Sequence, residues 1–560
     1  MKIFIDQYFS FIVIVIVINI VSGDGVRVWV EQGWLEGELL DLVTGDGSFN
    51  SFKGIPYAQP PIGTLRFKAP QPPLPWTGVL NATQHGSMCP QRDPLTNVLI
   101  PGNENCLFIN VYSTDLKPLD LMPVIVFIHG GGFKSGSGNV DHYSPDFLLR
   151  KNMVVVTFNY RLDALGFLSL GTEEVPGNAG MKDQVAALKW VQKNIKYFGG
   201  DANKVTLMGQ SAGSASVALH IISPMSKGLF HRAIALSGSP YNDWALSFHP
   251  ERRAFVLGKD LGFETEDPQQ LLEFLQSVSK DKLVDTSPNI LSFENYTSNT
   301  LKMSPFVPVI ETCYGNNSFL ANNIFKEFTH INKADILFGH TDQEAVTLIE
   351  SITSILIERY NKYPEFFAPQ KVLNEFQPTP ILKLSDRIYK HYFGKKRIDL
   401  NSTKEFINYA TYCSFTYDAV KFFLRLPIVG NTVRYMYKFS MVSSRNVYGE
   451  KGIPYGINGA AHLDDLAYLF DPKTFNLTLD AVEFGLIDQV TTIFADFAKT
   501  GNPMDSSAFD VTWPLFNNRT KQYMNLGNNG SQVITTVSSV DEDDELNFWE
   551  EFYASIGYYP

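Results

Sequence analysis

The chain has 560 residues, of which 44% are hydrophobic, and this is enough apolar material to fill a large folded core. Acidic residues outnumber basic residues by 58 to 46, and the resulting net charge of -12 argues against nucleic acid as a partner. Four cysteines are too few for a disulfide-dense scaffold, and none of them forms the CxxC pair that a zinc site would show. We therefore expect a globular protein that uses no metal and no cofactor.

The first 23 residues predict a secretory signal peptide. Lys2 precedes an apolar run from Phe11 to Ile18, and the small residues at 21–23 suit a signal peptidase. A transmembrane anchor needs about 20 apolar residues, whereas polar residues interrupt this segment on both sides. We expect the mature chain to start at Asp24, to be secreted, and to carry no membrane anchor.

Glycosylation sequons fit this secretory route, because Asn-x-Ser/Thr triplets accept N-glycans in secreted proteins. The triplets begin at Asn81, Asn295, Asn316, Asn401, Asn476, Asn518 and Asn529. Each triplet can arise by chance, so only the signal peptide makes the triplets evidence for glycosylation.

Short β-branched runs alternate with helical patterns through the middle of the chain. The pattern predicts strands at 124–128, 154–160, 205–208, 233–236, 334–338 and 433–439, helices near 181–198 and 214–222, and a mainly helical stretch at 345–430. This alternation is typical of a parallel sheet built from βαβ units. No linker-like segment or internal repeat divides the chain.

A G-x-S-x-G motif lies where the strand at 205–208 gives way to a helix. It runs from Gly209 to Gly213 and places Ser211 at its centre. A serine held at a sharp turn between strand and helix has its hydroxyl exposed, and the close backbone leaves room only for glycine on either side. The plain alternative is a serine that caps an ordinary helix.

A glycine-rich loop follows the strand at 124–128. His129 is followed by three glycines and Phe133. Bare backbone N–H groups at the end of a strand can point into one cavity, as the stabilisation of an oxyanion requires. The loop and the serine turn also occur in the chain order that α/β-hydrolases use, which favours a hydrolase over a merely flexible loop.

These motifs and several longer stretches resemble the carboxylesterase and cholinesterase family, and in particular its insect carboxylesterases. The stretches are at 52–58, 63–67, 105–112, 178–184 and 497–503, and the resemblance covers nearly all of the mature chain. It implies the α/β-hydrolase fold, with a central, mostly parallel sheet flanked by helices, as one domain over residues 24–560. It also implies a serine esterase that acts on small-molecule esters.

The acid of such a site must follow Ser211 in the chain and emerge at the end of a strand. The strand expected at 334–338 leads into a loop that contains both Asp342 and Glu344. Spacing alone leaves the two carboxylates open, and either could simply cap the next helix. The resemblance selects Glu344, although Ala345 stands where the family usually has glycine.

Two histidines, His391 and His462, follow this loop and are the candidates for the base. His391 lies between aromatic residues in an expected helix, a setting typical of a structural histidine. His462 lies in an expected loop after Gly459, which suits a base that reaches across to another segment. The resemblance also selects His462, because it matches the family pattern Gly-x-x-His-x-Asp.

The family chemistry assigns each residue a role. His462 would take the proton of Ser211 while Glu344 orients the imidazole. The backbone N–H groups of Gly131, Gly132 and Ala212 would hold the oxyanion. Some members of the family have lost catalysis and serve in adhesion, but they lack the serine or its partners.

The resemblance pairs Cys89 with Cys106 as the family's N-terminal disulfide. Cys313 and Cys413 match no family pair, so we expect them to be free and buried.

The substrate prediction is a neutral, apolar carboxylic ester. Cholinesterases bind a quaternary ammonium on a tryptophan inside their first disulfide loop, and residues 90–105 contain no tryptophan. Gln210 stands where cholinesterases have an acidic residue. Trp244 resembles an acyl-pocket residue or belongs to the core. Gln210, and Asp465 three residues after His462, also fit the pattern of juvenile hormone esterases, which is the alternative within the class.

Overall fold

The computed structural model describes residues 25–93, 98–290, 305–311, 318–321, 328–505 and 511–558. Within these ranges thirteen strands join one sheet, and two short strands pair separately. The strands are β1 Val26–Val30, β2 Gly33–Asp41, β3 Ser48–Pro56, β4 Val79–Asn81, β5 Gln91–Arg92, β6 Leu99–Ile100, β7 Phe108–Ser113, β8 Met122–Ile128, β9 Val154–Phe158, β10 Gly200–Gln210, β11 Arg232–Leu236, β12 Asp335–Thr341, β13 Arg434–Phe439, β14 Gln522–Asn529 and β15 Gln532–Ser539.

The large sheet runs in the order β1-β2-β3-β7-β9-β8-β10-β11-β12-β13-β14-β15, with β4 beside β2. Every pair from β9 across to β14 is parallel. The pairs from β1 to β9 in the sheet order and the pair of β14 with β15 are antiparallel, whereas β4 pairs with β2 in parallel. Parallel strands need crossover connections, and the chain supplies helices for them. The predicted central, mostly parallel sheet is therefore confirmed.

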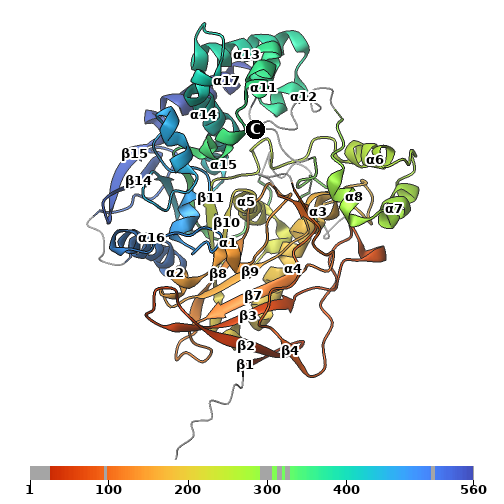
Figure 1. The fold of residues 1–560 in the computed structure, drawn as a ribbon, viewed down its shortest axis with the longest axis vertical. Helices are drawn as coiled ribbons and strands as arrows, with labels where there is room; N and C mark the ends of the chain where they lie inside the picture. The colour runs from red at the N-terminus through yellow and green to blue at the C-terminus, as the bar shows by residue number, and fades with distance from the viewer. Residues whose placement is uncertain are drawn as a thin grey trace, which may run out of the picture.

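The helices flank this sheet and also extend beyond its edge (Figure 1). They are α1 Val140–Tyr143, α2 Asp146–Leu149, α3 Asp163–Phe167, α4 Ala179–Asn194, α5 Ala212–Ile222, α6 Pro250–Asp260, α7 Pro268–Ser277, α8 Lys280–Asp285, α11 Ser354–Lys362, α12 Gln370–Glu375, α13 Pro378–Phe393, α14 Thr403–Thr411, α15 Tyr417–Arg425, α16 Ala481–Thr500 and α17 Asp544–Ser555. In the part of the chain that the structure describes, none of them has the length and apolar character needed to cross a membrane.

Strand β8 shows how the sheet divides two cores. Its side chains alternate, so that Val124, Val126 and Ile128 pack with α4 and α5 on one face, while Ile125 and Phe127 pack with α2 and α16 on the other. All five side chains are buried, as expected for a parallel strand covered on both faces. The sheet is thus a rigid support whose strand ends can carry a site.

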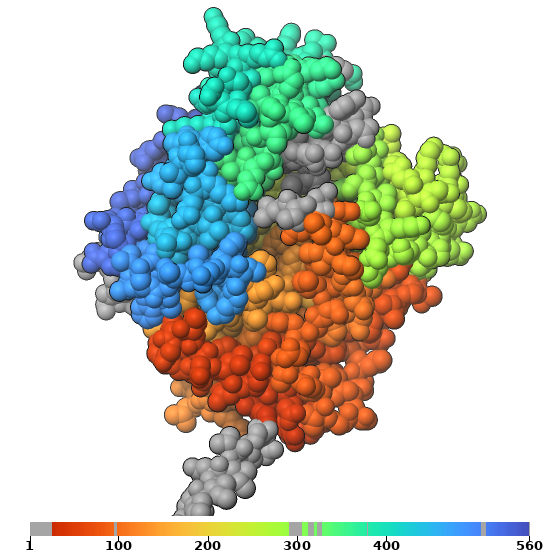
Figure 2. Space-filling model, in the orientation of Figure 1, coloured from red at the N-terminus to blue at the C-terminus, as the bar shows by residue number. Residues whose placement is uncertain are grey.

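Two helical groups project from this support. Figure 2 shows α6–α8 in yellow-green and α11–α13 in green to cyan as separate protrusions of the surface. The second group belongs to the mainly helical stretch predicted for residues 345–430. The site lies at the strand ends between the sheet and these helices.

Candidate active site

The candidate residues come together because parallel strands end at the same edge of the sheet. Strands β8, β10, β11 and β12 are neighbours in that order and all run in parallel. The glycine loop follows β8, Ser211 follows β10, and the loop that contains Asp342 and Glu344 follows β12. Segments that are far apart in the sequence therefore meet at one place.

Ser211 stands in a strained turn between β10 and α5. Its φ of 59° and ψ of -121° are unfavourable for a residue with a side chain. A Cβ on Gly209 would lie 2.3 Å from the carbonyl oxygen of Gly213, and a Cβ on Gly213 would lie 2.0 Å from that of Ile128. The two glycines of the motif are thus required by the close approach of the backbone.

The glycine loop lies directly against this serine. A Cβ on Gly130 would lie 3.0 Å from the Cβ of Ser211. Gly131 and Gly132 have φ values of 103° and 61°, which favour glycine. The carbonyl of Gly131 accepts hydrogen bonds from the following turn, whereas its own N–H group and those of Gly132 and Ala212 have no acceptor among the described residues. These N–H groups are available to a ligand.

His129 anchors the start of the loop. Its ring stacks on Tyr160 with 4.4 Å between the ring centroids, and the Tyr160 hydroxyl donates to the His129 carbonyl. Burial lowers the pKa of His129 to about 4, so this imidazole is neutral at ordinary pH. We read it as a support of the loop.

Glu344 and His462 form a hydrogen-bonded pair. The Oε2 atom of Glu344 lies 2.5 Å from Nδ1 of His462, and both side chains are buried. The other candidate acid, Asp342, accepts from the backbone N–H of Ala460 instead. The other candidate histidine, His391, lies on α13 and contacts Glu545 and Phe548 instead.

The pairing also explains the charge state of Glu344. Burial on its own would raise the pKa of this carboxyl, but His462, together with Ser237 and His340, outweighs burial and lowers the pKa below its ordinary value. An ionised Glu344 accepts a hydrogen bond from Nδ1–H of His462. Nε2 of the same ring is then the acceptor nitrogen, and it faces the serine turn.

Gln210 makes a contact that the sequence did not reveal. Its Nε2 lies 3.1 Å from Nε2 of His462, and the residue is fully buried. No hydrogen bond joins Ser211 to His462 in the ranges that the structure covers; the amide occupies the nitrogen that would accept the serine proton. Motif reading identified Gln210 only as the neighbour of Ser211.

Aromatic side chains close another side of the imidazole. Phe415 lies with its ring centroid 4.7 Å from that of His462 and 6.2 Å from that of Trp244. Trp244 is buried, and a Cβ on Gly238 would lie 3.0 Å from it and 2.4 Å from the carbonyl oxygen of Ser211. Trp244 therefore stands beside the candidate nucleophile, and Phe415 was missed by sequence reasoning.

A cavity of about 310 Å³ borders the glycine loop and the segment after His462. Its walls combine aromatic and aliphatic side chains with a few polar ones: Met88, Ile100, Tyr143, Val447, Tyr448, Leu466, Phe475, Gln91, Asp93, Asp141 and Asp464 are among them. This volume and this lining suit a small, mostly apolar ligand. Asp464 is already held by the backbone N–H groups of Tyr448, Gly449 and Ala461.

Comparisons with known proteins agree with this geometry. Residues 24–549 match the model of the carboxylesterase family. The chain belongs to the carboxylesterase family. The esterase is 31% identical to juvenile hormone esterase of Heliothis virescens over 500 residues, covering 85% of this chain and 86% of that protein. It is 33% identical to esterase B1 of Culex pipiens over 529 residues, covering 90% and 94% of the two chains.

A solved structure gives the same result for the fold. The crystal structure of juvenile hormone esterase from Manduca sexta, with OTFP covalently attached, matches with a TM-score of 0.82 and 29% identity, covering 94% of this chain and 99% of that chain. The predicted α/β-hydrolase fold is confirmed, and family membership makes the chain a carboxylic ester hydrolase.

The cysteines and sequons of the esterase lie as follows. Cys89 and Cys106 form a disulfide. Cys413 is a buried thiol that donates to the hydroxyl of Tyr409, whereas Cys313 is outside the described residues.

Five sequon asparagines are exposed, namely Asn81, Asn401, Asn476, Asn518 and Asn529, and Asn295 and Asn316 are outside the described ranges. Within those ranges, no three His, Cys, Asp or Glu side chains group to hold a metal ion.

Proposed function

We propose that the chain is a secreted serine carboxylesterase in which Ser211, Glu344 and His462 act together on neutral, apolar esters. The observation that carries the proposal is the 2.5 Å hydrogen bond between Glu344 and His462 at the sheet edge where Ser211 occupies its strained turn. A carboxylate, an imidazole hydrogen-bonded to it and a serine hydroxyl held in a tight turn are the parts that acyl transfer to serine requires.

The reaction proceeds in two halves. The Oγ atom of Ser211 attacks the ester carbonyl carbon while His462 takes the hydroxyl proton at Nε2. The carbon–oxygen bond to the alcohol then breaks, and His462 gives that proton to the departing alcohol. Water attacks the acyl-serine in the same way, so that the carboxylic acid leaves and Ser211 regains its proton.

The oxyanion forms in both halves next to the glycine loop. The free N–H groups of Gly131, Gly132 and Ala212 supply hydrogen bonds to it, and each such donor contributes about a hundredfold or more in rate. Because these groups belong to the backbone of a supported loop, they need little reorganisation during the reaction.

The test is Ser211→Ala assayed with a simple aryl ester. We expect a loss of kcat of about 10³-fold or more, with the fold retained by circular dichroism. A folded variant with unchanged activity would refute the nucleophile. An unmodified protein with no activity on any ester would instead favour a non-catalytic, adhesion-type member of the family.

The proposed substrate class rests on what surrounds the site. Gln210 brings an amide where an acid would be needed to attract a cation, and Trp244 lies beside Ser211 as part of an apolar wall. The relatives in Heliothis virescens and Manduca sexta are juvenile hormone esterases, so this hormone is the second candidate substrate. We expect kcat/KM to be higher for aliphatic acetates or juvenile hormone than for a choline ester. Preference for the choline ester would contradict the proposal.

Secretion is proposed from the leader at residues 1–23 and from the exposed sequons. The mature chain would be one domain that begins at Asp24 and carries N-glycans. Expression in insect cells should release a protein with Asp24 at its N-terminus, and treatment with an N-glycosidase should lower its apparent mass. Retention of Met1 in the secreted material would refute cleavage, and an unchanged mass would refute glycosylation.

A further inference from the structure

An aromatic row is exposed on the strands at the end of the molecule opposite helices α11 and α13 (Figure 1). Strands β1, β2 and β4 lie side by side there, and their register places Trp29 opposite Trp34 and Trp34 opposite Val79. These three residues, the tryptophan row, are 46%, 44% and 44% exposed. A single exposed apolar residue is common, but three in a row across neighbouring strands form a continuous apolar surface of the kind that marks a contact.

The backbone under the tryptophan row is fixed from the opposite face of the sheet. Trp76 donates from Nε1 to the carbonyl of Trp34 at 2.9 Å, and a Cβ on Gly33 would lie 2.5 Å from that same nitrogen. Leu35, the next residue of β2, is buried in the core. The rings of Trp29 and Trp34 meet edge to face, with 5.4 Å between their centroids. The exposed ring surface is therefore presented in a fixed arrangement.

A polar row lies beside the tryptophan row on the same face. Arg27, Glu36 and Asn81 each stand two residues along their strand from a member of the tryptophan row, and strand pairing places them opposite one another. Arg27 donates to Oε1 of Glu36 from Nε at 3.0 Å and from Nη2 at 2.8 Å. The face thus combines aromatic rings with charged hydrogen-bonding groups. A sugar matches this combination, because its C–H groups suit the negative face of a ring and its hydroxyl groups form a polar rim.

Asn81 provides an attachment point for a sugar on this face. Its Oδ1 accepts from the backbone N–H of Thr83 at 3.0 Å and from the Thr83 hydroxyl at 2.8 Å. Both bonds go to the oxygen, so the Nδ2 atom, which carries an N-glycan, has no partner among the described residues. In the sequon at Asn401, by contrast, Nδ2 lies 3.3 Å from Oδ2 of Asp399. The sequon of Asn81 therefore holds its own side chain ready for modification.

The tryptophan row lies within reach of a glycan on Asn81. Asn81 and Trp34 are one strand and two residues apart, which corresponds to about 8 Å. The first two sugars of an N-glycan span more than this distance. The opposite direction along β2 leads to Glu38, which forms an ion pair with Lys53. An apolar surface for the sugar thus lies on one side of Asn81.

We propose that the N-glycan on Asn81 packs its first sugars on the indoles of Trp34 and Trp29, which form a platform for it. The ligand is the N-acetylglucosamine core of this glycan, held by C–H contacts with the rings and by hydrogen bonds with the Arg27–Glu36 pair. The inference rests on the proposed secretion and glycosylation, and it is independent of the esterase reaction. Packing of the glycan also covers an apolar surface that favours aggregation when it is bare.

The first test measures chemical modification of the tryptophans. The protein secreted from insect cells is treated with N-bromosuccinimide, and the oxidation of each tryptophan is followed by peptide mapping. Asn81→Gln should raise the oxidation rates of Trp29 and Trp34 about fivefold, the ratio expected for loss of a contact as strong as an aromatic pair. Asn529→Gln removes an exposed sequon on β14 and is the matched control, which should leave both rates unchanged. The buried Trp549 is the internal reference.

The second test reverses the roles of sugar and ring. The double variant Trp29→Ser, Trp34→Ser lacks the platform, so an N-glycosidase should release the Asn81 glycan from the native protein about fivefold faster than from the unmodified protein. Ile534→Ser, Val537→Ser removes two similarly exposed apolar side chains on β15 and should leave this rate unchanged. Hydrolysis of an aryl ester at the unmodified rate verifies that each variant is folded.

The outcomes separate this proposal from the functions proposed above. If Asn81 carries a glycan but Trp29 and Trp34 are oxidised equally fast with and without it, or if Asn529→Gln has the same effect, the platform is refuted. If both tryptophans stay protected in Asn81→Gln until the protein is diluted, a second copy of the chain covers this face and the proposal is overturned. If Asn81 carries no glycan, glycosylation at this sequon fails and the platform with it, whereas the Ser211→Ala test of the esterase is unaffected.

Discussion

The side-chain amide of Gln210 hydrogen-bonds Nε2 of His462 at 3.1 Å. Nδ1 of the same imidazole is bonded to Glu344, so both ring nitrogens are occupied before any substrate arrives. The Oε1 atom of Gln210 is buried and has no partner in the part of the chain that the structure describes. In the proposed mechanism, Ser211 therefore competes with its own neighbour for the nitrogen that would take its proton.

Replacement of Gln210 by glutamate tests this contact. A carboxylate next to Nε2 stabilises the imidazolium, and because the reaction needs the neutral ring, the acid limb of kcat/KM should move to higher pH by about one unit. Activity on a choline ester should also rise relative to a neutral ester. The measurement is kcat/KM from pH 5 to 9 for both esters.

Gln532→Glu is the control for this change, since it adds the same charge at an exposed position on β15. It should leave the limb where it is. An acid limb that does not move in Gln210→Glu would mean that the amide contact is not made in solution.

Glu344→Gln should lower kcat by about 10³- to 10⁴-fold with little change in KM. An amide can present its NH₂ group to Nδ1 and so favour the wrong tautomer of His462, and it also removes the charge that stabilises the imidazolium. The measurement is steady-state kinetics with a simple aryl ester. Glu350→Gln, at an exposed position of the same segment, should retain activity; a comparable loss in both variants would contradict a specific role for Glu344.

Local sequence patterns were sufficient for the centre of the fold. The β-branched runs that predicted strands at 124–128, 205–208 and 334–338 lie in β8, β10 and β12, because a buried parallel strand needs a continuous apolar run. The serine turn could also be predicted from the sequence, since the close approach of Gly209 and Gly213 involves residues only four apart. The antiparallel outer strands carry weaker patterns and were not predicted.

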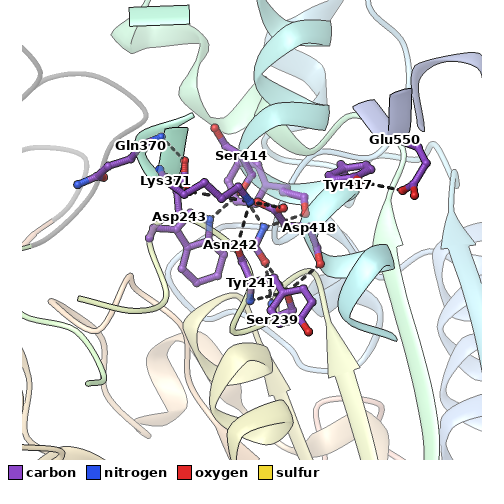
Figure 3. Close-up of polar contacts among 12 residues, drawn as sticks. Ser239, Tyr241, Asn242, Asp243, Gln370, Lys371, Ser414, Tyr417, Asp418 and Glu550 are labelled. Carbon is purple, nitrogen blue, oxygen red and sulfur yellow. Dashed lines mark hydrogen bonds and ion pairs between the residues drawn. The ribbon is translucent and has the colours of Figure 1, made fainter. Parts of the chain in front are cut away.

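Contacts between distant segments could not be predicted from local sequence patterns in the same way. Spacing did not decide whether Asp342 or Glu344 is the acid of the site. Both carboxylates in fact face the segment at 460–462: Asp342 contacts Ala460, and Glu344 contacts His462. The family resemblance, not the residues themselves, distinguished them. Phe415 contacts His462 from a π-helical turn at Tyr412–Thr416, and the side chain of the distant Asn242, drawn in Figure 3, donates to the Phe415 carbonyl. No local pattern encodes such a turn.

The disulfide between Cys89 and Cys106 closes a short loop that contributes to the cavity wall. The sequence separation is 17 residues, and closing a loop of this length stabilises a protein by about 3 kcal/mol in the chain-entropy model. The double variant Cys89→Ser, Cys106→Ser should lose about this free energy of unfolding in urea. A reductant should bring the unmodified protein to the same stability and leave the variant unchanged; equal stability of all samples would contradict the prediction.

Asp163 should make stability depend on pH in a direction opposite to that of an ion-paired acid. The residue is buried at the start of α3, and burial raises its pKa to about 6 although Lys134 favours the ionised form. Between pH 4 and 6 the folded protein keeps a proton that the unfolded chain has released. The contribution of Asp163 to stability therefore falls as pH rises through this window and is constant above it.

Asp163→Asn removes this titration and keeps an acceptor for the backbone N–H of Ala164, and asparagine tolerates the positive φ of 50° at this position. The difference in unfolding free energy between the variant and the unmodified protein should shift in favour of the variant by up to about 3 kcal/mol from pH 4 to pH 8. Asp120→Asn, at an exposed position, should show a difference that does not vary with pH. If Asp163→Asn also shows a constant difference, then the folded protein holds Asp163 ionised across this range, and the burial of its carboxyl is offset by groups such as Lys134 more strongly than we expect.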